Sequence, residues 1–361
     1  MPETKLKAVV IGATGYVGQR LLTLLADHPY FEVKRLVAGQ RSAGKRYSEA
    51  VKERWKLPEA MPEQYKDMYV YASDELETYC QGMDLAFCAV DMDKEAIVEL
   101  EEAVAKQELP LISNNSANRW TADVPMLIPE INAQHLAVIS QQKERLGTKR
   151  GFIVTKPNCS IQSFLPTLIP LRDLEIDQVV VSTYQAVSGA GRLLSDWPEM
   201  QGNIIPYISG EEEKTELEPL KILGRVEGNR IINADSPHFS GQCIRVPVQE
   251  GHLATVWVNF RKPCEANDIL LRWRNFQPKV QEMGLPSAPK PFLRYYEDQD
   301  RPQPKLDVDW ASGMGISIGR LREDPVFDYK YVCLSANTLR GAAGGSVLTA
   351  ELLYRLGYLD E

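Results

Sequence analysis

The chain has 361 residues, enough for two domains, and its 44% hydrophobic and 25% charged residues are typical of a globular protein. Its net charge of −8 argues against a nucleic-acid partner, because proteins that bind DNA or RNA usually present a basic surface. No apolar run approaches the roughly 20 residues that span a bilayer, and the N-terminus lacks a secretory-signal pattern, so no membrane role is expected.

The first 150 residues alternate short apolar runs with helical patterns, which indicates a parallel sheet covered by helices on both faces. Residues 40–70 are polar and irregular, and they are expected to form an excursion over the surface. In chain order we expect a strand at 6–12, a helix at 16–28, strands at 31–39 and 83–90, a helix at 94–107 and a strand at 109–114.

From about residue 152 the expected strands are longer and alternate more clearly, which favours an antiparallel or mixed sheet. These strands are expected at 179–189, 243–249 and 252–262. The Pro- and Gln-rich residues 277–309 are expected to form a long surface crossing or arm. The tail 337–359 is expected to be a helix with small residues on its first turns.

A glycine-rich turn, GATGYVG at residues 12–18, joins the first expected strand to the first expected helix. Its glycines permit a tight turn and let backbone amides approach a pyrophosphate at the helix N-terminus. The second strand ends in VAGQRSAGK, without the acid that usually binds the ribose of NAD. Arg41 can instead grip a 2′-phosphate and Ser42 can add a hydrogen bond, which favours NADP. A turn without a ligand is the alternative interpretation.

The six cysteines form no CxxC pair and only four histidines are present, which argues against a zinc site and indicates a reducing, cytoplasmic location. Cys159, in IVTKPNCSIQS, differs from the other five because Asn158 can cap a helix that carries it on the first turn. The helix dipole there favours a thiolate. Cys159 is therefore the candidate nucleophile, and a buried structural thiol is the alternative.

His252, in RVPVQEGH, is the candidate acid or base. If Glu250 and Gly251 form a two-residue hairpin turn, Arg245 and His252 share one face, and an anion anchor lies beside a titrating imidazole. A three-residue turn would place the two side chains on opposite faces. Taken alone, a histidine at a strand end is more often structural.

The charged segment GEEEKTELEPLKIL, residues 210–223, predicts a helix with Glu211 and Lys214 one turn apart. A carboxylate beside an ammonium suits a zwitterionic, amino-acid-like ligand. A solvated helix face is the alternative.

Together these motifs closely resemble one family, the aspartate-β-semialdehyde dehydrogenases, in the branch typical of archaea and fungi. The matching stretches occur in the family's order from residue 12 to about 345: GATGYVGQRLL, QRSAGK, SNNSANR, PNCS, YQAVSGAG, GEEEK, RVPVQEGH and NTLRGAAGG. The resemblance implies an α/β chain, with a Rossmann-type NADP-binding domain at 1–157 with 338–361. It also implies an α+β catalytic and dimerisation domain of the glyceraldehyde-3-phosphate-dehydrogenase-like type at 158–337, and a homodimer or homotetramer built on that domain's sheet.

The implied reaction is reversible and uses NADP. It reduces aspartyl-4-phosphate to L-aspartate 4-semialdehyde with release of phosphate, in the biosynthesis of lysine, methionine, threonine and isoleucine. Cys159 would form an acyl-thioester, His252 would act as acid and base, and Gln185 would orient the intermediate. A thioester divides one difficult step into two easier ones.

The resemblance also implies sets of binding residues and no metal. Arg245 would bind the α-carboxylate of the substrate, and Glu211 its amino group. The residues implied for the phosphate pocket are Arg119, Asn158 and Lys214. The residues implied for the cofactor are Gly12, Thr14, Gly15, Tyr16, Val17, Arg41, Ser42, Ser188, Gly189 and Asn337.

Other functions on this scaffold remain alternatives. Malonyl-CoA reductase shares the thioester chemistry, but Asn158, Glu211 and Lys214 fit a phosphate and an amino group better than coenzyme A. N-acetylglutamyl-phosphate reductase, or another acyl-phosphate reductase, is a second alternative. A non-catalytic NADP-binding regulator is a third, but it leaves the combination of reactive side chains unexplained. These side chains are Cys159, Gln185, Arg245 and His252.

Overall fold

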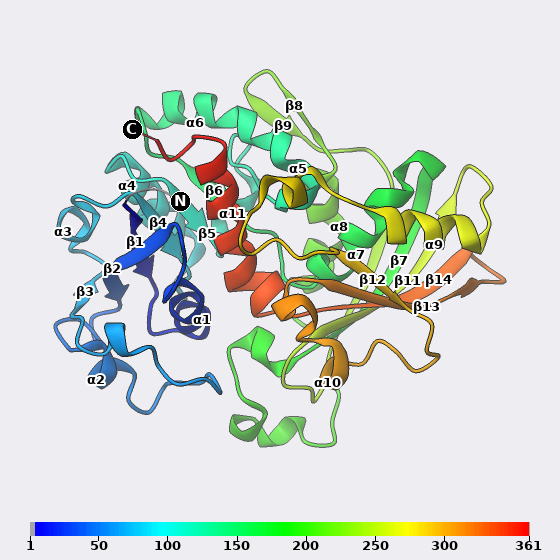
Figure 1. The fold of residues 1–361 in the computed structure, drawn as a ribbon, viewed down its shortest axis with the longest axis horizontal. Helices are drawn as coiled ribbons and strands as arrows, with labels where there is room; N and C mark the ends of the chain where they lie inside the picture. Colours follow the sequence, from blue (N-terminus) through cyan, green and yellow to red (C-terminus); the bar gives the residue numbers. More distant parts are fainter. Residues whose placement is uncertain (1–3, 361) are drawn as a thin grey trace.

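The computed structural model describes residues 4–360 and contains two six-stranded sheets side by side (Figure 1). The first sheet is parallel throughout, in the order β3-β2-β1-β4-β5-β6. Its strands are β1 (Leu6–Ile11), β2 (Phe31–Ala38), β3 (Val70–Ala72), β4 (Leu85–Cys88), β5 (Leu111–Ser113) and β6 (Ile153–Thr155). The parallel sheet and the four strands expected in it are confirmed, with ends that differ by one or two residues.

Helices cover both faces of this sheet, as its continuous apolar strands require. They are α1 (Tyr16–Leu25), α2 (Tyr47–Val51), α3 (Leu76–Cys80), α4 (Lys94–Lys106), α5 (Pro129–Asn132) and α6 (Ile139–Leu146). Leu21 of α1 belongs to the core of one face, and Val104 of α4 belongs to the core of the other. The expected excursion at 40–70 contains α2 and leads into the edge strand β3.

The second sheet is mixed, in the order β10-β7-β11-β14-β13-β12. Its strands are β7 (Ile176–Gln185), β10 (His238–Arg245), β11 (His252–Phe260), β12 (Leu293–Tyr296), β13 (Ile316–Glu323) and β14 (Tyr329–Ser335), and a small ribbon joins β8 (Arg225–Glu227) to β9 (Arg230–Ile232). The remaining helices are α7 (Ile161–Leu168), α8 (Glu211–Ile222), α9 (Ala266–Asn275), α10 (Pro304–Asp307) and α11 (Gly344–Arg355). The helices α7 and α9 pack on one face of this sheet (Figure 1).

Two sequence-based expectations in this region are wrong. The strands β10 and β11 form no hairpin, because each pairs with β7, which lies between them, β10 in parallel and β11 in antiparallel orientation. The segment 277–309 is more than a crossing, since it contains β12, which pairs in parallel with β13. Both errors concern partners that are distant in sequence, which local patterns do not identify.

The C-terminal helix α11 lies between the two sheets (Figure 1). Its Leu348 and Leu352 share a core with Leu21 and Leu22 of α1, so the end of the chain returns to the first sheet. A π-helical turn, Leu339–Ala343, lies between β14 and α11. None of the helices in residues 4–360 combines the length and apolar character that crossing a membrane requires.

Candidate active site

A cavity of about 230 Å³ lies where the two sheets meet. Parallel strands direct the loops at their carboxyl ends toward such a crevice, which is the usual ligand position in open α/β sheets. The lining comes from α1, from the segments after β5, β6, β7 and β14, and from α8. The lining residues are Val17, Asn114, Ser116, Arg119, Pro157, Asn158, Cys159, Ser188, Gly189, Lys214, Asn337, Thr338, Gly341 and Ala342.

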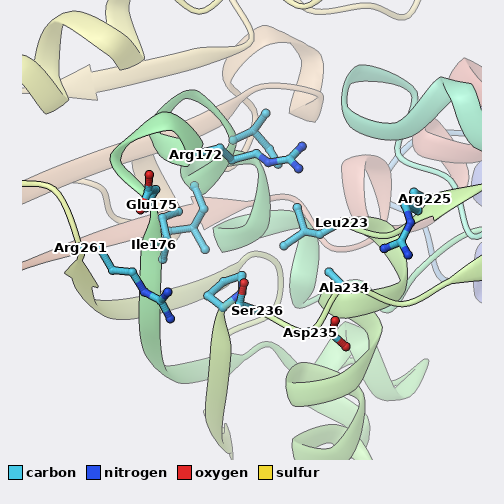
Figure 2. A pocket seen from close by; sticks show the side chains of 12 residues that line it. Arg172, Glu175, Ile176, Leu223, Arg225, Ala234, Asp235, Ser236 and Arg261 are labelled. Atoms are coloured by element: carbon cyan, nitrogen blue, oxygen red, sulfur yellow. The ribbon is translucent and has the colours of Figure 1, made fainter.

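A second, larger groove of about 430 Å³ lies at the other end of β7 (Figure 2). Two of its guanidinium groups have carboxylate partners, since Arg225 pairs with Glu227 at 3.0 Å and Arg261 pairs with Asp177 at 2.7 Å. Its lining within the described chain includes no cysteine or histidine. The smaller cavity is therefore the candidate active site.

The turn between β1 and α1 and the first turn of α1 each have one position that accepts only glycine. Gly12 has φ +88°, and a Cβ there would lie 2.1 Å from the Ala89 carbonyl oxygen. A Cβ on Gly18 would lie 2.2 Å from the Gly12 carbonyl oxygen. In the described chain α1 has neither a side-chain cap nor an acid in its first turn, so its first amides are available to an anion. Gly15, Thr14 and Tyr16 complete this turn, which fits the pyrophosphate of a dinucleotide.

The loop after β2 presents a basic groove. Arg41 is exposed and shares this groove with Lys45 and Arg54, whereas Ser42 is buried. The Ser42 hydroxyl accepts a hydrogen bond of 2.9 Å from Arg54 Nη2. These residues fit a ribose 2′-phosphate, and Arg54 is a basic group that the sequence analysis did not single out.

Cys159 and His252 form a close pair, with 3.3 Å between Sγ and Nε2. Cys159 does not lie on the first helical turn as expected, because α7 begins at Ile161 and Ser160 is its capping residue. Asn158 stabilises the turn before the helix, since its Oδ1 accepts hydrogen bonds from the Ser160 amide at 2.8 Å and the Ser160 hydroxyl at 2.7 Å. The helix-dipole argument for a thiolate is weakened accordingly.

The surroundings hold both members of the pair neutral. Burial raises the pKa of Cys159 to about 11, and Glu211 adds to the effect. Burial also lowers the pKa of His252 to about 3, and the Arg245 charge acts in the same direction. The Ala186 amide donates to His252 Nδ1 at 3.1 Å, so the neutral ring carries its proton on Nε2, toward the sulfur.

Arg245 and His252 converge although no hairpin joins them. Both lie at ends of strands that flank β7, and a Cβ on Gly189 would lie 3.0 Å from Arg245 Nη1 and 3.0 Å from His252 Nε2. Arg245 Nη1 donates to the Ala186 carbonyl at 2.6 Å. The anion anchor and the imidazole therefore share one site.

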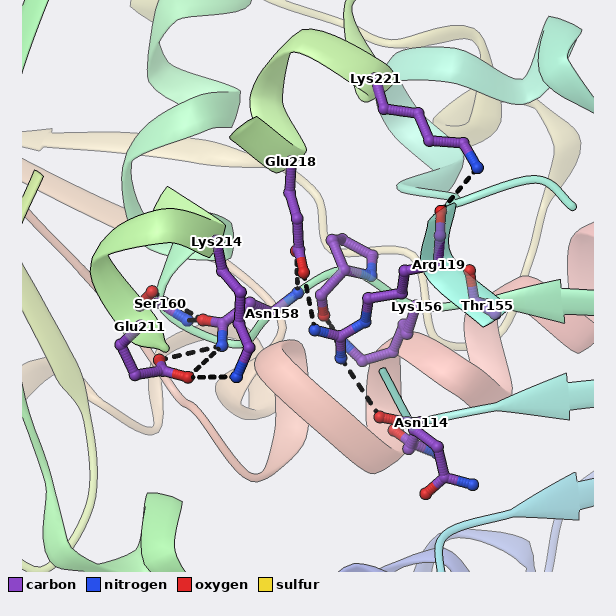
Figure 3. A network of polar contacts seen from close by, with 12 residues as sticks. Asn114, Arg119, Thr155, Lys156, Asn158, Ser160, Glu211, Lys214, Glu218 and Lys221 are labelled. Carbon is purple, nitrogen blue, oxygen red and sulfur yellow. Dashed lines mark hydrogen bonds and ion pairs between the residues drawn. The ribbon is translucent and has the colours of Figure 1, made fainter. Parts of the chain in front are cut away.

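A buried carboxylate, Glu211, organises the polar side of the cavity (Figure 3). Its oxygens accept bonds of 2.8 and 2.9 Å from Asn158 Nδ2, of 3.2 Å from Gln185 Nε2 and of 2.9 Å from Lys214 Nζ. Burial raises the pKa of Glu211, but Lys214 and these hydrogen bonds outweigh burial and hold the pKa below its ordinary value. Glu211 is therefore an anion that can meet a substrate ammonium.

Asn337 and Ser188 border the opposite side of the cavity. Asn337 Nδ2 donates to Ser188 Oγ at 2.8 Å, and Asn337 Oδ1 accepts from the Gly251 amide at 2.8 Å. Nearby, Glu250 accepts bonds from the Tyr16 hydroxyl at 2.7 Å and from the Thr338 hydroxyl at 3.0 Å. Glu250 thus links the glycine-rich turn to the second sheet, a role that the sequence analysis did not predict.

Two buried charged residues beside the cavity were also missed. Lys156 directly precedes the PNCS turn, and burial lowers its pKa to about 7. Glu218 lies on α8, and its spacing from Glu211 and Lys214 on one helix face was the signal that could have identified it.

A parallel dinucleotide-type sheet that faces a cysteine–histidine pair in a cavity defines a class, the dehydrogenases that act through a covalent cysteine intermediate. Residues 7–139 match the family model described as semialdehyde dehydrogenase, NAD binding domain, and residues 168–340 match its dimerisation domain. Curated relatives that are 40% identical over nearly the whole chain are named aspartate-semialdehyde dehydrogenase, and the chain belongs to that family. The predicted family and fold class are confirmed.

Curated relatives of that name come from archaea and fungi. One from Archaeoglobus fulgidus is 40% identical over 96% of this chain and 97% of its own length. One from Schizosaccharomyces pombe is 40% identical over 98% of this chain and 99% of its own length. The crystal structure of aspartate semialdehyde dehydrogenase with NADP from Candida albicans superposes with a TM-score of 0.88 at 36% identity, covering 98% of this chain and 100% of that one.

Proposed function

We propose that this protein catalyses the reversible, NADP-dependent reduction of aspartyl-4-phosphate to L-aspartate 4-semialdehyde, with release of phosphate. The observation that carries the proposal is the contact of 3.3 Å between Cys159 Sγ and His252 Nε2 in a cavity that also presents Arg119 and Lys214. The names of the full-length relatives, and the NADP in the Candida albicans structure, support the same reaction over malonyl-CoA reduction.

The first half-reaction uses Cys159 as nucleophile. Its sulfur attacks the acyl carbon of the substrate, the bond from that carbon to the phosphate oxygen breaks, a thioester forms, and the thiol proton leaves on the released phosphate. Arg119, Asn158 and Lys214, which line the cavity beside Cys159, receive the phosphate. Lys156, Arg119 and Arg245 all lower the pKa of Cys159 and so favour its thiolate.

The second half-reaction reduces this thioester. When bound, NADPH supplies the hydride that adds to the thioester carbon. In this proposal His252 Nε2–H donates to the oxygen that gains negative charge. The C–S bond then breaks, the semialdehyde leaves and Cys159 is regenerated, with one proton consumed over the cycle.

Substrate and cofactor contacts are part of the proposal. Arg245 binds the α-carboxylate, Glu211 binds the amino group and Gln185, which contacts Glu211, orients the intermediate. The cofactor extends from the turn at 12–17 to a 2′-phosphate site at Arg41 and Ser42. Its nicotinamide end lies near Ser188, Gly189 and Asn337.

The assembly and the location are further parts of the proposal. The domains divide as 1–157 with 338–361, and 158–337, which is supported by the return of α11 to the first sheet. The second sheet forms a homodimer or homotetramer, which is supported by the matching dimerisation model. A cytoplasmic location is supported by six cysteines without disulfides in the described chain.

The first test is an activity assay with the Cys159→Ala variant as control. The native protein is expected to oxidise aspartate semialdehyde with NADP only when phosphate is present, measured as NADPH absorbance. Cys159→Ala is expected to lose this activity because no thioester can form. Activity with malonyl-CoA and none with the semialdehyde contradicts the proposal.

The second test concerns the cofactor phosphate. Arg41→Ala is expected to raise the KM for NADP about tenfold or more, because a charge-assisted contact with the 2′-phosphate is lost. The KM for NAD should stay unchanged. Lys34→Ala is the matched control, because Lys34 is a partly exposed cation on β2, the strand that leads into the Arg41 loop. An unchanged NADP-to-NAD ratio in Arg41→Ala refutes this role.

A further inference from the structure

Glu218 is a fully buried carboxylate that joins two parts of the phosphate side of the cavity (Figure 3). Its Oε1 accepts a bond of 2.8 Å from Arg119 Nη1, and its Oε2 accepts a bond of 2.7 Å from the Asn158 amide. Arg119 follows β5 of the first sheet, whereas Asn158 directly precedes the nucleophile. One side chain of α8 therefore holds both groups.

The same helix also holds the backbone around Arg119. Lys221 Nζ donates to the carbonyls of Arg119 at 2.6 Å, Thr121 at 2.9 Å and Val124 at 3.0 Å. Glu211, Lys214, Glu218 and Lys221 are spaced three, four and three positions apart, so they lie along one face of α8. At the start of α8 this face carries Glu211, the carboxylate proposed to bind the substrate. At the end of α8 it carries Lys221, which contacts the segment around Arg119.

The guanidinium of Arg119 keeps donors for an anion. Nη1 is taken by Glu218, and Nη2 makes one long bond of 3.3 Å to the Asn114 carbonyl. Nε is buried and meets no acceptor within residues 4–360. Arg119 lines the cavity together with Lys214 and Asn158. A buried donor without a partner is costly, and a phosphate oxygen would supply the missing acceptor.

We propose that Glu218 is a positioning residue for the phosphate step. It holds the Arg119 guanidinium and the Asn158 backbone in the arrangement that receives the phosphate, without contacting the substrate. The inference rests on the proposed phosphate role of Arg119. The charges around Glu218 support the inference. Its carboxylate pairs with Arg119, and its negative charge raises the pKa values of Lys156 and Lys221, which burial lowers.

The test uses Glu218→Gln in the full chain. The amide keeps the shape but places an NH₂ group against one of the two donors, Arg119 Nη1 or the Asn158 amide. We expect the KM for phosphate in the oxidative direction to rise about tenfold, with less than threefold change in kcat and in the KM for NADP. Phosphate protection of Cys159 against iodoacetamide should weaken by the same factor.

Glu216→Gln is the matched control, because Glu216 lies on the same helix and accepts a single bond of 3.0 Å from the Gly241 amide. Arg119→Gln and the double variant Arg119→Gln/Glu218→Gln complete the set. If Glu218 acts largely through Arg119, the KM for phosphate of the double variant rises by less than the product of the two single effects. The double variant removes both members of the buried Glu218–Arg119 ion pair, so Arg119 is not left without its carboxylate and the comparison remains available even if Glu218→Gln alone does not fold.

The outcomes separate the two proposals. If Arg119→Gln leaves the KM for phosphate unchanged, the proposed role of Arg119 is wrong, and the inference is wrong with it. If Arg119→Gln raises this KM while Glu218→Gln behaves like Glu216→Gln, only the inference is overturned. Equal rises in the KM for phosphate, NADP and semialdehyde, or an additive double variant, also overturn it.

Discussion

At the scale of single residues, the reactive pair is held uncharged by its surroundings. The pKa of Cys159 is raised and that of His252 is lowered, so at pH 7 the two rest as thiol and imidazole. The nearby cations lower the pKa of Cys159 and so oppose the effect of burial. One of them, Lys156, gains or loses its charge near pH 7, because burial lowers its own pKa to about 7. Formation of the Cys159 thiolate therefore depends more on these neighbouring charges than on the dipole of α7.

Acid should destabilise the native protein through His252. Unfolded histidine has a pKa near 6.5, whereas His252 in the fold has a pKa of about 3, so between these values only the unfolded chain takes up the proton. The stability present above pH 6.5 is lost as pH falls, by about 3 kcal/mol between pH 7 and pH 4. His252→Gln should lose about 3 kcal/mol less over this interval, measured by urea unfolding at fixed protein concentration. An identical loss in both proteins contradicts the assignment.

The sequence predicts single reactive residues better than their supports. Cys159 and the Glu211–Lys214 pair could be singled out because a local motif surrounds each. Helical spacing places Glu218 on the same face as that pair, but its partners could not be predicted, because Glu218 lies 60 positions from Asn158 and 99 from Arg119. Lys156 has no local signal, since burial defines its role. Only the folded chain brings these charges together.

At the scale of elements, strand and helix patterns were predicted well, whereas pairing was not. Nearly every expected strand exists within a few residues of its predicted range, because alternation is a local property. The hairpin through Glu250 and Gly251 failed because β7 inserts between β10 and β11. Arg245 and His252 still meet, since both lie at the same end of strands adjacent to β7.

The turn before α11 should be intolerant of a single methyl group. A Cβ on Gly341 would lie 2.8 Å from Cys159 Cβ and 3.2 Å from its Cα. Alanine normally favours a helix over glycine, but here it must displace the nucleophile. We expect Gly341→Ala to lower kcat about 100-fold, because displacement of a reacting group by about 1 Å has effects of that size. Gly39→Ala, where a Cβ meets open space, is the control in the same steady-state assay. Native kcat in Gly341→Ala would show that the contact is unimportant.

At the scale of the whole molecule, the second sheet has one covered and one open face. The helices α7 and α9 pack against Val181, Val256 and Tyr331, which belong to one face. The alternating residues on the other face form cross-strand rows, with Trp257 opposite Val180 on β7 and Lys330 on β14. Alternation in the sequence predicts that such a face exists, but not what covers it.

Because the second half of the chain matches a dimerisation model, we expect a second copy to cover this face. Trp257→Glu places a charge in the middle of its rows and should separate the copies, since interface cores exclude unpaired charges. Sedimentation velocity at micromolar concentration should then give a species near the 40.7 kDa of one chain. Leu271→Glu changes an exposed leucine on α9, on the other side of the sheet, and should leave the assembly intact. If the Trp257→Glu protein keeps the native mass, the subunits associate through a different surface.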